Sequence, residues 1–109
     1  CMAGASISAT LIESKTLLFG KACELTSLKY INEDTAARFL QVFDAAAIAD
    51  VTLGTTRPDY VLVAAQNAAD NYHGSGLKFN KGIVVAPTTT ATGSTAAADD
   101  KTHVFGEVR

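Results

Sequence analysis

Short runs of β-forming residues separated by turn residues are the feature that most restricts how this chain can fold. Short strands with turn signals about every 8–12 residues are typical of a β-sandwich or a β-barrel. No segment between the runs has the length and apolar period of a helix, which disfavours parallel strands joined by helices. The sequence therefore predicts an all-β fold, an antiparallel β-sandwich or a jelly-roll-like barrel of about 6–8 short strands.

The clearest strand pattern lies between residues 24 and 43. Residues 24–32 (ELTSLKYIN) alternate apolar and polar side chains, which is the pattern of a half-buried strand. Residues 37–43 (ARFLQVF) are apolar on both faces, as expected of a strand that is covered on both sides. Since a polar break of about four residues separates the two runs, we expect them to pair as an antiparallel hairpin.

The remaining strands are marked by β-branched and aromatic residues. We expect them at residues 10–21 (a strand pair with a turn or an edge crossing at 13–15, or a short helix as the alternative), 59–65, 77–87 (two short strands or one bent at Gly82) and 103–108. The expected connections are residues 44–58, which would begin with a helical turn N-capped by Asp44, the polar residues 66–75, and the exposed Thr/Ala-rich residues 88–100. Pro58 cannot donate to a central ladder, so it marks the start of a strand or an edge strand.

The 109 residues are enough for one domain with a core of its own. Residues 13–109 are expected to form this domain, a single β-sandwich. Residues 1–12 are expected to form an extended N-terminal arm, because residues 1–9 are small and weakly apolar; a frayed tail is the alternative. Much of the 48% hydrophobic fraction is alanine, so the core should be thin and should draw part of its stability from neighbouring molecules.

Charge and hydropathy argue against two classes of partner. The formal net charge is −2, and the nine Lys and Arg residues are scattered singly rather than in the basic stripe of a nucleic-acid-binding protein. No run approaches the roughly 18 apolar residues of a membrane span, and the first residues lack the pattern of a secretory signal. We therefore expect neither a nucleic acid nor a membrane as a partner.

Residues that could carry catalysis or hold a metal ion are few. Cys1 and Cys23 match no metal-ligand spacing, and Cys23 is interpreted as a small buried apolar residue, with a disulfide to Cys1 as the alternative. His73 could be drawn into a dyad with Cys23 or a serine, but a solvated loop histidine is the simpler interpretation, and His103 is interpreted as an exposed strand residue. The acidic pairs 33–34 and 99–100 lack the EF-hand pattern, and phosphate-loop and GxSxG motifs are absent. The sequence thus predicts no catalytic residue, no cofactor and no metal, and the protein is not expected to be an enzyme.

Residues 25–46 (LTSLKYINEDTAARFLQVFDAA) resemble a pattern of small virion proteins of tailed bacteriophages. In that pattern a strand with an asparagine and a short polar turn precede an aromatic-rich strand similar to RYLQLYN. The matching residues here are Tyr30, Asn32, Arg38, Phe39, Leu40, Gln41 and Phe43, with Asp44 in place of the usual asparagine. The resemblance continues through the Gly/Thr/Pro residues 54–58, the apolar residues 60–64, an F-x-x-GI-x-V segment (Phe79, Gly82, Ile83, Val85) and the Thr/Ala/Gly-rich residues 88–98, and so covers residues 25–109, about three-quarters of the chain.

This resemblance implies a non-catalytic structural protein of the phage virion. The most direct expectation is a capsid decoration (cement) protein that binds and stabilises the assembled shell, with the major capsid protein as its partner. The alternative is a tail, neck or fibre-associated module that binds a receptor or a carbohydrate, and an enzyme or an enzyme inhibitor is a third, weaker interpretation. Such a protein would be made in the host cytoplasm, would reside on the capsid surface of the virion, and is expected to be a homo-dimer or a homo-trimer.

Two segments are candidates for contacts within such a particle. They are the apolar residues of the N-terminal segment and the threonines within residues 88–97: Met2, Ile7, Leu11, Ile12, Thr88, Thr89, Thr90 and Thr92. For the carbohydrate alternative, the one cluster of an aromatic ring with amides is Tyr72 with Asn67, Asn71 and His73, which a plain polar loop explains equally well.

Overall fold

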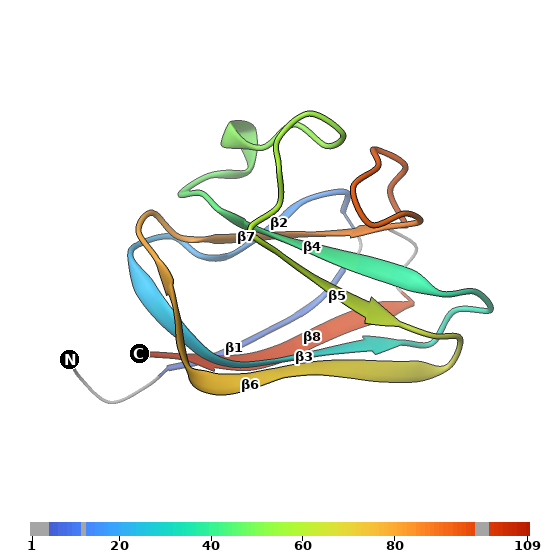
Figure 1. The fold of residues 1–109 in the computed structure, drawn as a ribbon, viewed down its shortest axis with the longest axis horizontal. Coiled ribbons are helices and arrows are strands. Elements are labelled where there is room, and N and C mark those ends of the chain that lie inside the picture. Colours follow the sequence, from blue (N-terminus) through green and yellow to red (C-terminus); the bar gives the residue numbers. More distant parts are fainter. Residues whose placement is uncertain (1–4, 12, 98–100) are drawn as a thin grey trace.

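The computed structural model describes residues 5–11, 13–97 and 101–109, which form two four-stranded antiparallel sheets packed face to face (Figure 1). One sheet has the strand order β1-β8-β3-β6 and the other β2-β7-β4-β5. The strands are β1 (Ala5–Thr10), β2 (Thr16–Phe19), β3 (Cys23–Asn32), β4 (Arg38–Asp44), β5 (Tyr60–Ala64), β6 (Ala68–Phe79), β7 (Ile83–Thr88) and β8 (Thr102–Val108). The prediction of an all-β sandwich is confirmed.

The main core fills the space between the two sheets with side chains from alternate strand positions. Tyr30 and Phe79 are its largest fully buried members, and both come from the first sheet. Each buried aliphatic or aromatic side chain contributes roughly 1.5–3 kcal/mol through removal of apolar surface from water. The aliphatic residues of the core that are essentially inaccessible are Leu11, Leu25, Leu28, Leu40, Val42, Leu62, Ile83, Val85 and Val104.

A second, smaller apolar cluster lies on the outer side of the β2-β7-β4-β5 sheet. Phe43 of β4 and Val84 and Ala86 of β7 are buried there together with Val51, which belongs to the connection after β4. Figure 1 shows this connection and the one after β7 lying over the sheet. We therefore call β2-β7-β4-β5 the covered sheet, and β1-β8-β3-β6, whose outer side is described below, the open sheet. The expectation that β4 is covered on both sides is confirmed.

The predicted hairpin between the two best strand patterns is wrong. Both strands exist, but β3 lies in the open sheet between β8 and β6, whereas β4 lies in the covered sheet between β7 and β5. The turn that joins them crosses from one sheet to the other, and the buried Asn32 at the end of β3 holds it there. The amide Nδ2 of Asn32 donates hydrogen bonds to the carbonyl oxygens of Ala36 (2.8 Å), Ala64 (3.2 Å) and Ala65 (3.0 Å). These bonds tie the crossing to the end of β5.

The N-terminal segment differs from the extended arm that the sequence suggests. Residues 5–10 form β1, which pairs with β8 along its whole length and so makes one edge of the open sheet. Ile7 is 7% exposed and Leu11 is fully buried, so both side chains belong to the main core. The domain therefore includes residues 5–11, because these two side chains fill the core; residues 1–4 and 12 lie outside the described residues.

Residues 66–75, expected to be a polar loop, are mostly strand. β6 begins at Ala68 and pairs with β3 as the other edge strand of the open sheet. Opposite Thr26 of β3, three residues of β6 (74–76) replace one, so the strand bulges there. The polar composition misled the prediction because an edge strand is held by its backbone and leaves many side chains in water.

The helical turn expected after β4 is present, but Asp44 does not cap it. The turn is a 3₁₀ helix, η1 (Ile48–Asp50), with Ala47 at its N-cap position. The carboxylate of Asp44 instead accepts hydrogen bonds from three successive backbone N–H groups of residues 80–82, at 3.0, 2.8 and 3.4 Å. It thereby fixes the β6–β7 turn. At Gly82 in this turn a Cβ would lie 2.6 Å from two carbonyl oxygens, so only glycine fits.

The strand pair expected within residues 10–21 is wrong, because β1 pairs with β8 and β2 pairs with β7 in different sheets. Other sequence predictions agree with the structure at least in part. A bend at residues 13–15 joins β1 to β2, and β5 follows Pro58 as an edge strand. Residues 77–87 contain the end of β6 and the separate strand β7, and the last strand is β8. The Thr/Ala-rich connection is exposed only in part, because Thr88 ends β7 in the interior and Ala97 is buried. Among the described residues, no helix is long and apolar enough to span a membrane.

Candidate binding surface

The outer side of the open sheet carries short polar side chains around one aromatic ring. The strand register places Ser8, Phe105, Lys29 and Asn71 in one row across β1, β8, β3 and β6. The neighbouring row contains Ser6, Glu107 and Ser27. Phe105 is 50% exposed, the highest value among the exposed large hydrophobic residues of the described chain. A single exposed apolar side chain is ordinary on a protein surface, so what Phe105 can bind depends on the groups around it.

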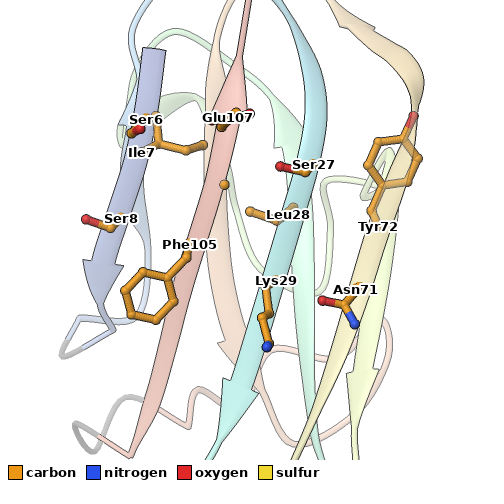
Figure 2. A pocket seen from close by; sticks show the side chains of 11 residues that line it. Ser6, Ile7, Ser8, Ser27, Leu28, Lys29, Asn71, Tyr72, Phe105 and Glu107 are labelled. Atoms are coloured by element: carbon orange, nitrogen blue, oxygen red, sulfur yellow. The ribbon is translucent and has the colours of Figure 1, made fainter. Parts of the chain in front are cut away.

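These rows border a shallow groove with a volume of about 730 Å³. Figure 2 shows it from close by, with Ser6 and Ser8 on β1, Phe105 and Glu107 on β8, and Lys29 on β3. Asn71 and Tyr72 come from β6 on the far side. The volume lies within the range of about 300–1,000 Å³ that small-molecule sites occupy. We call this surface the open-face groove.

The polar side chains of the open-face groove form no side-chain interactions that stabilise the described part of the chain. None of them has a side-chain hydrogen bond or ion pair with another described residue. Most of them are exposed, and Ser27 is half-buried. They offer hydroxyl, amide, ammonium and carboxylate groups to an incoming molecule: Ser6, Ser8, Ser27, Lys29, Asn71 and Glu107.

The cluster expected around Tyr72 is divided by the fold. Asn71 faces the open-face groove, whereas the ring of Tyr72 packs edge-on against Tyr60 of β5, with 5.3 Å between the ring centroids, at the margin of the groove. Asn67 lies in the β5–β6 turn with a φ of 52° and borders a separate hollow beside Glu33. His73 belongs to β6. Asn71 thus contributes to the open-face groove, whereas Asn67 and the ring of Tyr72 lie apart from it or at its margin.

The outer side of the covered sheet has a different character. The other exposed large hydrophobic residues of the described chain are Leu17, Ile48 and Val63. Leu17 pairs with Val84 and Val63 pairs with Phe39, so both point to the outer side, and Ile48 begins η1 in the connection that covers it. The loop after β7 lies over the same sheet (Figure 1). We call this side of the molecule the loop side.

The structure separates the predicted interface residues into three groups. Ile7, Leu11 and Thr88 are buried in the domain, so their side chains are not available for the contacts expected of them. Thr89 is half-buried, and Thr90 and Thr92 are exposed in the loop after β7. Met2 and Ile12 lie outside the described residues.

The ring of His103, on β8 of the open sheet, is hydrogen-bonded through both of its nitrogens. Its Nδ1 lies 3.1 Å from the hydroxyl of Thr10, and its Nε2 lies 3.1 Å from the carboxylate of Glu33. A hydroxyl, an imidazole and a carboxylate in this order are also the parts of a nucleophilic triad. Here the Glu33 side chain is 63% exposed and the hydroxyl belongs to Thr10, a residue within β1. We interpret these hydrogen bonds as links that fasten the end of β1 to β8.

Cys23 behaves as the buried apolar residue that the sequence suggests. Its thiol is free, and burial, followed by the negative charge of Asp44, raises the pKa of the thiol above its ordinary value. For Asp44, burial acts to raise the pKa, but the backbone N–H donors of residues 80–82 and the charge of Lys81 outweigh it and hold the pKa below its ordinary value. Within residues 5–11, 13–97 and 101–109, no group of three or more His, Cys, Asp or Glu side chains could hold a metal ion.

Comparison with known proteins gives a plain result. No family model, curated protein or solved structure matches this chain. The residues of each surface are therefore the basis for assigning its role.

The open-face groove was missed at the level of sequence, although one signal of it is present. In the last strand, THVFGEV, Val104 and Val108 occupy the buried positions, so Phe105 is a large apolar residue in the polar half of the alternation. Lys29 and Asn71 carry no comparable signal. They come together with Phe105 only through the pairing of β3 with both β8 and β6.

Proposed function

We propose that this protein is a non-catalytic structural component of a tailed-phage virion, a decoration protein that binds the assembled capsid shell. Its partner is the major capsid protein of the same particle, and it acts as a homo-dimer or homo-trimer on the capsid surface. The proposal is supported by the resemblance of residues 25–109 to small phage virion proteins and by the rigid β-sandwich with two dissimilar outer sides.

The observation that carries the proposal is the distribution of exposed apolar residues. Of the four exposed large hydrophobic residues in the described chain, Leu17, Ile48 and Val63 belong to the loop side. Three exposed apolar side chains on the loop side, against one on the opposite side, favour the loop side as the surface that contacts a protein partner. A decoration protein repeats its contact many times over a shell, so the sum of modest contacts is sufficient for stable coverage.

The Thr-rich loop supports the same side as the docking surface. Thr90 and Thr92 are exposed at its tip, while the buried amide of Gln41 donates hydrogen bonds to the carbonyl oxygens of Thr90 (3.5 Å) and Gly93 (3.0 Å). The loop is therefore held in shape before any partner arrives. Preformed loops lose less conformational entropy on binding, which favours affinity.

Co-sedimentation with capsid shells tests this proposal. The purified protein should sediment with assembled shells and should not bind unassembled shell subunits, because a decoration site spans several subunits. Ile48→Glu and Val63→Glu should each weaken shell binding by about tenfold or more, since each places a charge in an apolar contact. Phe105→Ser, which changes an equally exposed apolar residue on the opposite side, is the matched control and should bind normally.

Two results would contradict the proposal. One is equal binding of assembled and unassembled shell protein, or binding of neither. The other is normal binding of both loop-side variants. Loss of binding in Phe105→Ser alone would transfer the docking surface to the open sheet.

The open-face groove favours a second candidate function, that of a tail or fibre-associated module which binds carbohydrate. Its free hydroxyl and amide groups around an exposed ring are the observation in favour. Carbohydrate binding by this groove does not require the loop side. The copy number of the protein in the particle distinguishes a tail or fibre module from a decoration protein.

A further inference from the structure

The open-face groove is the surface of this molecule whose chemistry most narrowly defines a ligand. We propose that it binds an uncharged oligosaccharide of about two or three sugar units, seated on the ring of Phe105. This inference goes beyond shell binding, because it concerns the side of the sandwich opposite the loop side. It specifies the ligand of the second candidate function, the carbohydrate-binding module, and does not exclude decoration by the loop side.

The aromatic ring of Phe105 matches the apolar face of a sugar. Phe105 is half exposed in the middle of the sheet, flanked by Ser8 on β1 and Lys29 on β3 rather than by other large apolar residues. Figure 2 shows its ring over the space between β8 and β1. An isolated ring with polar neighbours fits a ligand that has a small apolar face and a polar rim, and the C–H face of a pyranose has these properties. A protein partner would favour a wider apolar patch.

The hydrogen-bonding groups of the groove match the hydroxyl groups of a sugar. Ser6, Ser8 and Ser27 each offer a donor and acceptors, and the carboxamide of Asn71 offers both kinds. None of these side chains has a hydrogen bond with another residue of the described chain. Sugar hydroxyls are themselves both donors and acceptors, so they match a surface of mixed polarity whose groups are not already paired.

The balance of charge in the groove favours an uncharged ligand. The groove has one ammonium, Lys29, and one carboxylate, Glu107, on adjacent strands one row apart. Its formal charge is therefore zero. A site for a polyanion would gather several Lys or Arg residues, as Arg and Lys clusters do for phosphates. An uncharged ligand gains hydrogen bonds from both groups without leaving a charge unbalanced.

The groove is built on a rigid sheet. The groove residues are carried by neighbouring strands, with β8 in register with β1 along its length and with β3 from Ser27 to Asn32. At Gly106, the residue after Phe105, a Cβ would lie 2.4 Å from the carbonyl oxygen of Ser27, so β8 and β3 approach closely there. A site built on paired strands keeps its groups in fixed positions, which suits recognition of a flat ligand.

Backbone amide NMR of the ¹⁵N-labelled protein tests the proposal. The probes are maltotriose, cellotriose, lactose and chitotriose as uncharged saccharides, with sialyllactose and heparin tetrasaccharide as charged ones. At least one uncharged probe should cause saturable shifts confined to residues 6–8, 27–29, 71–72 and 105–107. The charged probes should cause smaller shifts or none.

Two variants test the named residues. Phe105→Ala and Asn71→Ala should each weaken binding of the responding saccharide by about tenfold, because one removes the ring and the other a hydrogen-bonding group. Both residues are exposed, so both variants should give folded spectra. Val63→Ala is the matched control: it removes a similarly exposed apolar side chain from the loop side and should leave saccharide affinity unchanged.

Three results would overturn the inference. They are the absence of saturable shifts with every uncharged probe, stronger binding of a charged probe, and unchanged affinity of Phe105→Ala. Shifts of the same residues that depend on protein concentration alone would assign the groove to self-association and would also overturn it. Each of these outcomes leaves the shell-binding experiment unaffected, so failure here and failure of the proposed function are distinguishable.

Discussion

On the loop side of the molecule, the carboxamide of Gln41 donates a hydrogen bond to the hydroxyl of Thr88, 3.0 Å away. The hydroxyl of Thr88 in turn donates to the carbonyl oxygen of Thr90 at 2.7 Å. Both side chains are fully buried, so a polar pair at the outer side of the covered sheet determines the shape of the Thr-rich loop. The exposed threonines that we assign to the shell contact depend on it.

Replacement of Gln41 should therefore loosen the loop. We expect Gln41→Ala to lower the free energy of unfolding by about 1–3 kcal/mol, since buried loop carbonyls lose their donor. Urea denaturation measures this loss, and hydrogen exchange should show faster exchange at the N–H of Thr89, which bonds to the carbonyl of Thr95. The exposed Gln66 provides a control, for which Gln66→Ala should change stability by less than about 0.5 kcal/mol. Equal effects of the two substitutions would show that Gln41 does not fasten the loop.

Asn32 is expected to be the most sensitive polar residue of the fold. Asn32→Ala removes the donor to the carbonyl oxygens of Ala36, Ala64 and Ala65 and should destabilise the protein by about 2–4 kcal/mol. The measurement is the midpoint of chemical denaturation, with the exposed Asn71→Ala as control. If Asn32→Ala unfolded at the same denaturant concentration as Asn71→Ala, the crossing between the sheets would not depend on this amide.

Asp44 should make stability depend on pH in the acidic range. Its pKa in the folded protein is lowered below its ordinary value, because the N–H donors of residues 80–82 outweigh the opposing effect of burial. The unfolded chain therefore binds a proton more readily, and the stabilisation is fully present above about pH 4 and is lost as pH falls through the folded pKa. Asp44→Asn should be less stable than the parent at pH 7, and the difference should shrink toward pH 2.

The matched control for Asp44 is Asp50→Asn, an exposed carboxylate on η1. Denaturation curves at several pH values give the two differences. A constant difference between Asp44→Asn and the parent from pH 7 to pH 2 would contradict the assignment.

Cys23 should be a poorly reactive thiol. Burial, with the nearby charge of Asp44, raises the pKa of this thiol, so little thiolate forms at neutral pH and the sulfur is shielded. In a Cys1→Ser background, a colorimetric disulfide reagent at pH 7.5 should react with the folded protein at least about tenfold more slowly than with the same protein in urea. Fast reaction of the folded protein would show that the thiol is accessible.

The sequence predicted what depends on local alternation. On β3, Leu28 and Tyr30 face the core of the domain, whereas Lys29 between them faces water. On β8, Val104 and Val108 face the core, as the two-residue period of a strand requires. The double-sided apolar pattern around Phe43 correctly indicated a strand covered on both sides, because a strand loses its polar face only when both faces are covered.

The sequence could not predict which strands pair. A short polar turn such as residues 33–37 can close a hairpin or cross between sheets, and Asn32 selects the crossing only through carbonyls that are distant in sequence. β6 was missed because it is an edge strand with polar side chains, and the burial of Ile7 depends on pairing of β1 with a strand almost a hundred residues later. The candidate groove is missed for the same reason, since its residues come from four strands.

The central claim is that this chain coats a phage shell, and its copy number in purified particles tests this most directly. Quantitative mass spectrometry gives the ratio of this protein to the major capsid protein in virions that carry it. The account predicts hundreds of copies per particle, in a simple ratio to the shell subunit. A few to a few dozen copies would assign the protein to the tail or neck, and absence from the particle would contradict a virion role altogether.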